Sequence, residues 1–268
     1  MGILNRTADS FYDGGRTGLA ESVKHAEAMV QEGADIIDIG GVKAGPGQEV
    51  NEHEELERVV PLVAEVCERT GATVSVETSR PPVAAAALAA GASIVNDVSG
   101  LAEPGLAAAC SRAGGRLVLM HHGGQIRGRP RNPRYDDVVE DVLACWVELA
   151  ARAEREGMKR VDLIVDPGLD FGKTTFHSLE LMRRLPELTE GGFPVLIAAS
   201  RKDLVGESLD LPLSERLEGS LALVALAVLH GAALVRVHDV AESVRVVRMV
   251  ESVLGVRPPA APVRGLWE

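Results

Sequence analysis

The sequence predicts an α/β fold, and within that class a single-domain (β/α)8 TIM barrel, from three observations. Eight short apolar runs alternate with eight longer segments that have helical spacing. A length of 268 residues is about what one such barrel occupies. Each apolar run ends in a polar residue, as expected where parallel strands deliver side chains to one rim of a barrel. One domain is therefore expected over residues 1–268, with residues 256–268 as an irregular tail.

The predicted strands and helices follow one another in a regular order. Strands are predicted at residues 1–4, 35–39, 73–76, 93–95, 116–120, 163–165, 195–199 and 234–237. Helices are predicted at residues 19–31, 52–69, 82–90, 104–113, 136–156, 178–188, 214–229 and 241–254. Four helices run into a glycine, where a left-handed residue would close the last turn: Gly33, Gly91, Gly157 and Gly231.

The amino-acid composition argues against some classes of binding partner. The formal net charge of −11 argues against nucleic acid, because phosphate backbones bind basic faces. Neither a membrane span nor a signal peptide is visible in the sequence. The cysteines Cys67, Cys110 and Cys145 lack metal-type spacing and are predicted to be buried free thiols. We therefore expect a cytoplasmic protein without a nucleic-acid or membrane partner.

The segment 161–173 shows the strand-end pattern most clearly. Its apolar run breaks abruptly into Asp166, Pro167 and Gly168. The proline disfavours a helical conformation at Asp166, and the glycines at 168 and 172 permit a loop that crosses close over the carboxylate. A simple turn aspartate is the alternative for Asp166 taken alone.

Four polar residues end a strand with no evident helix to cap: Glu77, Asn96, Asp166 and Lys202. If their strands meet in one barrel, a carboxylate, an amide and an ammonium converge on one mouth. A carboxylate can accept two parallel N–H bonds from an amino-amide edge, and the amide and the lysine can serve the remaining nitrogens and carbonyl. This set predicts a site for a flat, nitrogen-rich ring.

A second set predicts an anion site. Arg236 and His238 follow the last strand, and Asn5 follows the first, so the three are neighbours once the barrel closes. Arginine and histidine donors beside backbone amides suit a phosphate group. A core histidine bonded to a carbonyl is the alternative for His238.

Other polar residues are predicted to be structural. Asp38, Asp97 and Asp239 are interpreted as caps or rim salt bridges. Adjacent histidines on a strand point to opposite faces, so His121 and His122 are not expected to share a metal ion. Lys173 follows a glycine as in a phosphate loop, but the remaining spacing of that motif is absent.

Six segments, in order and at comparable spacing over nearly the whole chain, resemble the signatures of the dihydropteroate synthases. They are residues 2–11, 33–41, 96–100, 166–173, 200–202 and 236–239. The resemblance implies a TIM-barrel homodimer that joins a pterin-methyl diphosphate to 4-aminobenzoate in folate synthesis, with Mg²⁺ as cofactor. Pterin-binding roles would then fall to Glu77, Asn96, Met120, Asp166, Phe171 and Lys202. Asn5 would meet the diphosphate and its metal, and Arg236 and His238 would bind phosphate. Lys202, Asp166 and Arg236 would be the catalytic residues.

The chain also departs from the family pattern. Glu77 stands where the family usually has aspartate, which changes the reach of the carboxylate. After Gly41 the family typically continues Glu-Ser-Thr-Arg-Pro-Gly, but this chain has Val42, Lys43, Ala44 and Gly45 before Pro46. A lysine at 43 cannot reproduce the guanidinium fork of the missing arginine. Further departures are Arg6, Ala8 and Gly123.

The residues expected to bind the pterin largely match the family pattern, whereas those expected to bind the arylamine acceptor are altered. This difference leaves three functions open. The first hypothesis is a synthase of dihydropteroate type. The second is a pterin-binding paralogue with weak, absent or altered acceptor activity. A third, by analogy of fold alone, is a methyl-transferring pterin barrel with a corrinoid partner.

Overall fold

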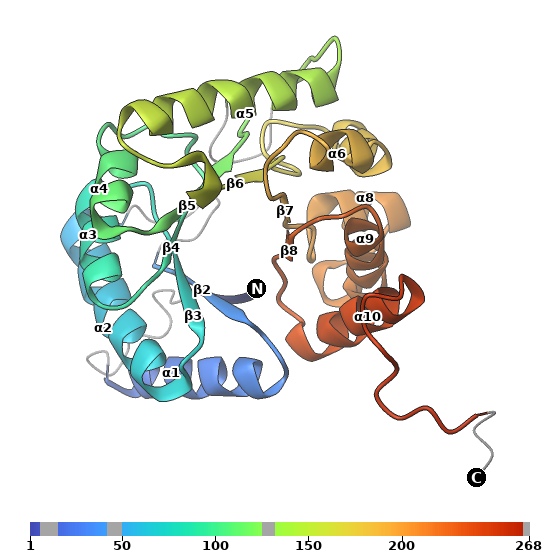
Figure 1. Ribbon diagram of the computed structural model, residues 1–268, viewed down its shortest axis with the longest axis horizontal. Helices are drawn as coiled ribbons and strands as arrows, with labels where there is room; N and C mark the ends of the chain where they lie inside the picture. Colours follow the sequence, from blue (N-terminus) through green and yellow to red (C-terminus); the bar gives the residue numbers. More distant parts are fainter. Residues whose placement is uncertain (6–15, 42–49, 125–131, 265–268) are drawn as a thin grey trace.

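The computed structural model describes residues 1–5, 16–41, 50–124 and 132–264, in which eight parallel strands are surrounded by helices (Figure 1). The strands are β1 (Gly2–Asn5), β2 (Ile36–Gly40), β3 (Thr73–Glu77), β4 (Ile94–Asp97), β5 (Arg116–Met120), β6 (Leu163–Asp166), β7 (Leu196–Ile197) and β8 (Leu234–Val235). The helices are α1 (Arg16–Gln31), α2 (Glu52–Thr70), α3 (Pro81–Ala89), α4 (Leu106–Ala113), α5 (Val138–Arg155), α6 (Thr175–Arg183), α7 (Leu185–Thr189), α8 (Asp203–Leu209), α9 (Leu217–Leu229) and α10 (Val240–Val253). Short 3-10 turns lie at Arg160–Asp162 and Leu213–Glu215.

The strands close into a barrel. Strands β1 to β6 pair in chain order in one parallel sheet, and β7 pairs with β8. Single bridges join the two sheets, Val165 to Val195 on one side and Gly2 to Val237 on the other. Backbone hydrogen bonds of 3.0 Å run across both seams, from Val165 N to Pro194 O and from Ile3 N to Val237 O. The predicted (β/α)8 barrel is thereby confirmed.

Alternation along the strands separates the inside of the barrel from its outer layer. Side chains inside the barrel form an apolar cluster of Ile94, Val118, Ile164, Leu196 and Ala198. The intervening positions pack outward against the helices in a larger core, for example Val95, Leu117 and Val165. Since side chains repeat every two residues, the next inward position on β4, β5 and β6 is Asn96, Met120 or Asp166. The interior of the barrel is therefore apolar in its middle and polar at the carboxyl ends of the strands.

Several boundaries differ from the predicted ones. The helix predicted at 178–188 is two helices, α6 and α7, and the helix predicted at 104–113 begins at Leu106. Helix α8 was not predicted, and β7 and β8 are two residues long, shorter than the predicted runs. The four glycines expected to end helices do adopt positive φ, from 83° to 114°.

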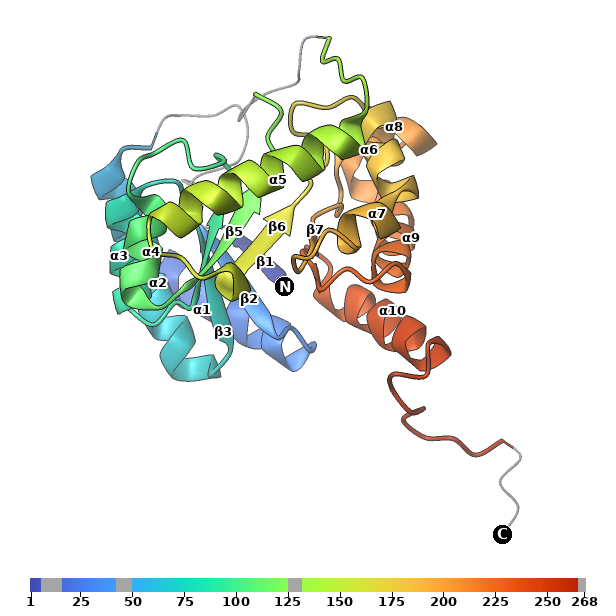
Figure 2. The same ribbon diagram turned by 45° about the horizontal axis from the view of Figure 1, so that its top comes forward.

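The three cysteines are free, as predicted. Cys110 is fully buried, whereas Cys67 and Cys145 are half-buried. Within the described ranges, no helix is long and apolar enough to cross a membrane. Beyond α10 the chain up to residue 264 has no helix or strand and extends away from the barrel (Figures 1 and 2).

Candidate active site

A cavity of about 420 Å³ lies at the carboxyl ends of the strands. All nine residues predicted for the site contribute to its lining: Asn5, Glu77, Asn96, Met120, Asp166, Phe171, Lys202, Arg236 and His238. They come from β1, β3, β4, β5, β6 and the segments that follow β6, β7 and β8. The fold thus brings the two predicted sets of polar side chains into one space, which is large enough for a bicyclic ligand.

Strand register explains why the side chains meet. Glu77 lies directly opposite Asn96, and Met120 lies opposite Asp166. Between Asn5 and Glu77 the register places Gly40, and a Cβ atom there would stand 3.0 Å from Asn5 Oδ1. The missing side chain of this glycine leaves room for the Asn5 amide.

Asp166 and Lys202 form the acid and ammonium pair of the site. Asp166 is 5% exposed, and its Oδ1 accepts a hydrogen bond of 2.7 Å from Gly168 N. Lys202 Nζ donates to Leu169 O at 2.7 Å and lies 5.0 Å from the centre of the Phe171 ring. Burial raises the pKa of Asp166, and the nearby Lys202 opposes this rise. Burial likewise lowers the pKa of Lys202, against the pull of Asp166.

Arg236 is engaged by two carboxylates. Its Nε donates to Asp38 Oδ2 at 2.6 Å, and its Nη2 donates to Glu77 Oε2 at 2.5 Å. Asn96 Nδ2 donates to the same Asp38 oxygen at 3.2 Å. Burial raises the pKa of Glu77, although Arg236 opposes the rise. For Arg236, burial favours loss of the proton, but the two carboxylates outweigh it and raise the pKa.

His238 and Asn5 lie at the mouth of the cavity. Both residues are exposed, so the alternative of a core histidine at 238 is wrong. His238 N donates to Ser200 Oγ at 3.2 Å, and the ring Nδ1 lies 3.1 Å from the same oxygen. Partial burial and the nearby Arg236 lower the pKa of His238. The ring of His238 can offer an N–H donor to an anion.

The three aspartates interpreted as structural do make structural contacts. Asp97 accepts hydrogen bonds from Ser99 N at 2.9 Å and Leu101 N at 2.6 Å, and so shapes the turn after β4. Asp239 is paired with Arg201, whose Nε lies 2.9 Å from Asp239 Oδ2. Asp38 is fully buried and lies below the cavity, where its contacts with Asn96 and Arg236 orient two site residues.

The sequence interpretation of Lys202 needs one correction. Lys202 occupies the N-cap position of α8, so the expectation that it ends a strand with no helix to cap is wrong. Its side chain makes no capping hydrogen bond, which leaves the ammonium directed to the cavity. Ser200 and Arg201 also line the cavity. Their position directly after the seventh predicted strand was the signal that could have identified them.

Most of the residues at which the chain departs from the family pattern, including those expected near the arylamine substrate, lie outside the described residues. Arg6, Ala8, Val42, Lys43, Ala44 and Gly45 are all in segments that the structure does not describe. The loop ends that it does describe are fixed by arginines. Arg58 Nη1 donates to Gly41 O at 3.2 Å, and Arg80 Nη2 donates to Val50 O at 2.7 Å.

One described side chain at the cavity could contribute a ligand to a magnesium ion. Across the described parts of the chain, no group of three or more His, Cys, Asp and Glu side chains could hold a metal. Asn5 offers one amide oxygen at the mouth of the cavity. Mg²⁺ is commonly held by one or two protein oxygens, most often from carboxylates, together with substrate phosphates and water, so Asn5 would supply one ligand of such a set.

A closed barrel whose strand ends surround one polar cavity defines a small-molecule-binding α/β-barrel protein, and comparison with known proteins gives its family. Residues 1–238 match the family described as "Pterin binding enzyme". The chain is 46% identical to "Inactive dihydropteroate synthase 2" of Mycobacterium leprae, with 99% of this chain and 94% of that one covered. It is 42% identical to the dihydropteroate synthase of Escherichia coli strain K12, with 96% and 92% covered. The crystal structure of Yersinia pestis dihydropteroate synthase with a sulfonamide drug superposes with a TM-score of 0.89, at 40% identity and with 96% and 94% covered. The chain belongs to the pterin-binding enzyme family, in its dihydropteroate synthase group.

Proposed function

We propose that the protein is a dihydropteroate synthase-type transferase, which joins 6-hydroxymethyl-7,8-dihydropterin diphosphate to 4-aminobenzoate. The observation that supports this most is the single cavity in which Asp166, Asn96 and Lys202 face one space together with Arg236. Acceptors and donors of this kind match the amino-amide edge and ring nitrogens of a pterin. Met120 and Phe171 supply apolar walls for its flat faces.

The proposed reaction needs positioning and charge stabilisation rather than a covalent intermediate. The C–O bond between the pterin methylene and the diphosphate breaks, and its electron pair leaves with the diphosphate. The amine nitrogen of 4-aminobenzoate forms the new C–N bond and loses a proton. Arg236 and His238 stabilise the departing charge. Asn5 would hold a Mg²⁺ ion, which would supply further charge neutralisation for the diphosphate.

Turnover and pterin affinity test this proposal. The purified protein should form dihydropteroate from the two substrates with Mg²⁺, and no product at high enzyme concentration would contradict a synthase. Asp166→Asn and Lys202→Ala should each weaken pterin binding by roughly 10- to 100-fold, because each removes a charged hydrogen-bond partner. Asp136→Asn and Lys24→Ala change exposed residues outside the cavity lining and serve as matched controls in calorimetry. Unchanged affinity in both cavity variants would show that the pterin binds elsewhere.

A second candidate function is pterin binding with little or no transfer. Two observations favour it: a relative named as inactive matches nearly the whole chain, and Glu77 engages the guanidinium that would bind phosphate. Pterin binding without product would support this candidate. The double substitution Ala44→Thr with Gly45→Arg restores the usual family residues, and a gain of turnover would assign the loss to that loop.

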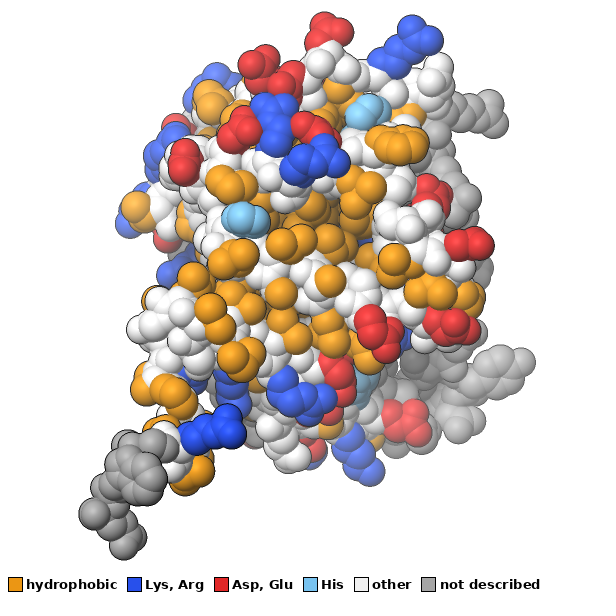
Figure 3. Space-filling model, turned by 90° about the vertical axis from the view of Figure 1, so that its right-hand side faces the viewer, with side chains coloured by type: hydrophobic (Ala, Val, Ile, Leu, Met, Phe, Trp, Pro, Cys, Tyr) orange, Lys and Arg blue, Asp and Glu red, His pale blue; other side chains and the backbone are white. Residues whose placement is uncertain are grey.

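The proposal includes a homodimer in the cytoplasm. Helix α9 has one charged residue, Glu218, among thirteen, although it lies on the outside of the barrel. Figure 3 shows the side of the molecule on which α9 and α10 lie, and hydrophobic side chains gather on this face. The exposed hydrophobic residues of α9 and α10 include Leu226, Leu229, Met249 and Val253, all at least 40% exposed. A second copy of the chain is the occupant that we propose for this face, and the three free thiols suit a reducing compartment.

A further inference from the structure

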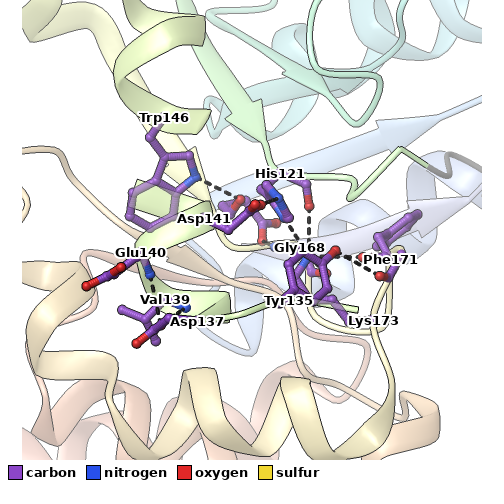
Figure 4. Close-up of polar contacts among 12 residues, drawn as sticks. His121, Tyr135, Asp137, Val139, Glu140, Asp141, Trp146, Gly168, Phe171 and Lys173 are labelled. Atoms are coloured by element: carbon purple, nitrogen blue, oxygen red, sulfur yellow. Dashed lines mark hydrogen bonds and ion pairs between the residues drawn. The ribbon is translucent and has the colours of Figure 1, made fainter. Parts of the chain in front are cut away.

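Lys173 is a buried lysine that the proposed chemistry does not use. Figure 4 shows it beside Tyr135 and Phe171, and the residue is 3% exposed. Nζ lies 3.1 Å from His121 O, 3.0 Å from Gly168 O and 3.0 Å from Phe171 O. A fourth contact of 2.7 Å joins Nζ to His121 Nδ1. An ammonium surrounded by neutral acceptors compensates its lost hydration by hydrogen bonds.

The contact with Asp141 determines the tautomer of the His121 ring. A carboxylate has only acceptors, so Nε2 carries a ring proton, and Nδ1 of the neutral ring then accepts from Lys173. Nε2 lies 2.8 Å from Asp141 Oδ1 on α5, which can accept that proton's hydrogen bond. Burial, and after it the nearby Lys173, lower the pKa of His121 to about 4 although Asp141 opposes them, so the ring is neutral at pH 7. Burial lowers the pKa of Lys173 to about 7, and Asp166 opposes the loss of its proton. The three side chains form one directed series from Lys173 through His121 to Asp141 (Figure 4).

The same contacts fix the loop that follows β6. At Gly168 the loop backbone lies so close to β5 that an added Cβ would stand 2.0 Å from His121 O. The carbonyls of Gly168 and Phe171 both accept from Lys173, and Tyr135 Oη donates to Gly172 O at 2.9 Å. Helix α5 holds the start of the loop as well, because Trp146 Nε1 donates to Asp166 O at 3.2 Å.

This loop supplies two side chains to the cavity lining and one carbonyl that holds Lys202. Asp166 begins it, the Phe171 ring lines the cavity, and Leu169 O accepts from Lys202. The position of Lys202 therefore depends on a loop that Lys173 holds from behind. We propose that Lys173 is a positioning residue for the pterin site, and that His121, in contact with Lys173 through Nδ1 and with Asp141 through Nε2, orients it. This inference rests on the proposed function, because it assigns Lys173 to the binding of the same pterin.

The experiment measures binding of 6-hydroxymethylpterin by calorimetry in the full chain. Lys173→Met should weaken binding by about 10- to 100-fold, because a misplacement of about 1 Å in a binding group has effects of that size. Lys24→Met makes the same substitution at an exposed position of α1 and should leave affinity unchanged. In steady-state assays the loss should fall mainly on KM for the pterin, because the leaving-group residues are untouched.

Two substitutions of His121 separate orientation from simple packing. His121→Asn keeps an oxygen near the place of Nδ1 and should stay within about fivefold of the parent, the worth of one hydrogen bond. His121→Leu removes the acceptor and should match Lys173→Met. This pair tests the inference even if Lys173→Met does not fold. Nitrogen-15 NMR of the histidine rings should show His121 as the Nε2–H tautomer in the parent.

Each outcome bears on the inference in a distinct way. Tight binding by both Lys173→Met and His121→Leu would overturn it, and so would an Nδ1–H tautomer of His121 in the parent. Equal losses of pterin affinity in His121→Asn and His121→Leu would show that the His121 ring contributes only packing. That result would overturn the inference that His121 orients Lys173. Failure of the parent itself to bind the pterin would overturn the proposed function, and this is visible before any variant is compared.

Discussion

Glu77 and Arg236 show how one methylene can change a binding site. The resemblance to the family suggests aspartate at position 77, whereas the longer side chain here approaches Arg236 to 2.5 Å. Asp38 already engages the other side of the same guanidinium at 2.6 Å. A phosphate group that approaches Arg236 must therefore compete with two carboxylates for its N–H donors.

Shortening this side chain should strengthen anion binding. Glu77→Asp withdraws the carboxylate from Nη2, and we expect inorganic diphosphate to bind about tenfold more tightly, the worth of one charged hydrogen bond. Isothermal titration with diphosphate and Mg²⁺ measures the change. Glu21→Asp, at an exposed position of α1, is the matched control. Equal or weaker binding in Glu77→Asp would show that the pair does not restrain Arg236.

Residues of the cavity differ in how far the sequence could predict them. Glu77, Asn96 and Asp166 were identifiable because a two-residue period carries the inward face of each strand to its polar end. The contribution of Lys173 was not identifiable, because its partner His121 is 52 positions away in the chain. Only the packing of the loop after β6 against β5 shows that the two side chains meet.

At the scale of elements, the loop after β6 is held by close backbone contact. Gly168 has a φ of 64°, and its added Cβ would overlap His121 O. Gly168→Ala should therefore combine backbone strain with a steric overlap and reduce the free energy of unfolding by more than about 2 kcal/mol. The measurement is denaturant unfolding followed by circular dichroism.

Gly71 provides the control for this substitution. It has nearly the same φ, 63°, and nothing lies within 4 Å of its added Cβ. Gly71→Ala should thus show the strain alone, about 1 kcal/mol. Equal losses at positions 71 and 168 would mean that the close approach to β5 has no energetic consequence.

The contact between β5 and α5 should make stability depend on pH. Burial holds the pKa of His121 near 4, well below the ordinary value of 6.5, so the unfolded chain binds a proton more readily. Stability from this residue is then present above pH 6.5 and is lost as the pH falls towards 4. The value of about 4 includes the effects of Lys173 and His122, which act in the same direction as burial, and of Asp141, which opposes them.

Between pH 7 and pH 5 this residue alone should reduce the free energy of unfolding by about 2 kcal/mol. Urea unfolding at the two pH values measures the loss. His121→Asn has no titrating ring and should lose correspondingly less over the same interval. Parallel pH profiles for the parent and this variant would contradict the assignment to His121.

Element boundaries were predicted well where apolar periodicity was strong, and poorly where local chemistry intervened. Pro186 cannot donate a backbone hydrogen bond, so the helix predicted at 178–188 divides into α6 and α7. Helix α8 has only seven residues, too few to show a clear helical period. Strands β7 and β8 are shorter than their apolar runs because regular pairing covers only two residues of each.

At the scale of the molecule, the apolar face of α9 and α10 should determine the oligomeric state. Introducing charge there with Leu226→Glu and Leu229→Glu should convert the proposed dimer to monomers, because two buried carboxylates would lack partners. Sedimentation equilibrium gives the mass directly. Val161→Glu adds a carboxylate at a position that is 80% exposed and lies outside this face, and should leave the mass unchanged. A monomeric parent would refute the dimer without any variant.

Single bridges join the six-stranded sheet of the barrel to the two-stranded sheet of β7 and β8. Asp166 lies in the six-stranded sheet, whereas Lys202 and Arg236 follow β7 and β8, so a ligand that touches all three links the two sheets. Amide protons such as those of Val165 and Ile3, whose bonds cross the junctions, should exchange with solvent more slowly once the cavity is filled. Slower exchange of these amide protons would then show that a bound ligand hinders opening of the barrel at its junctions.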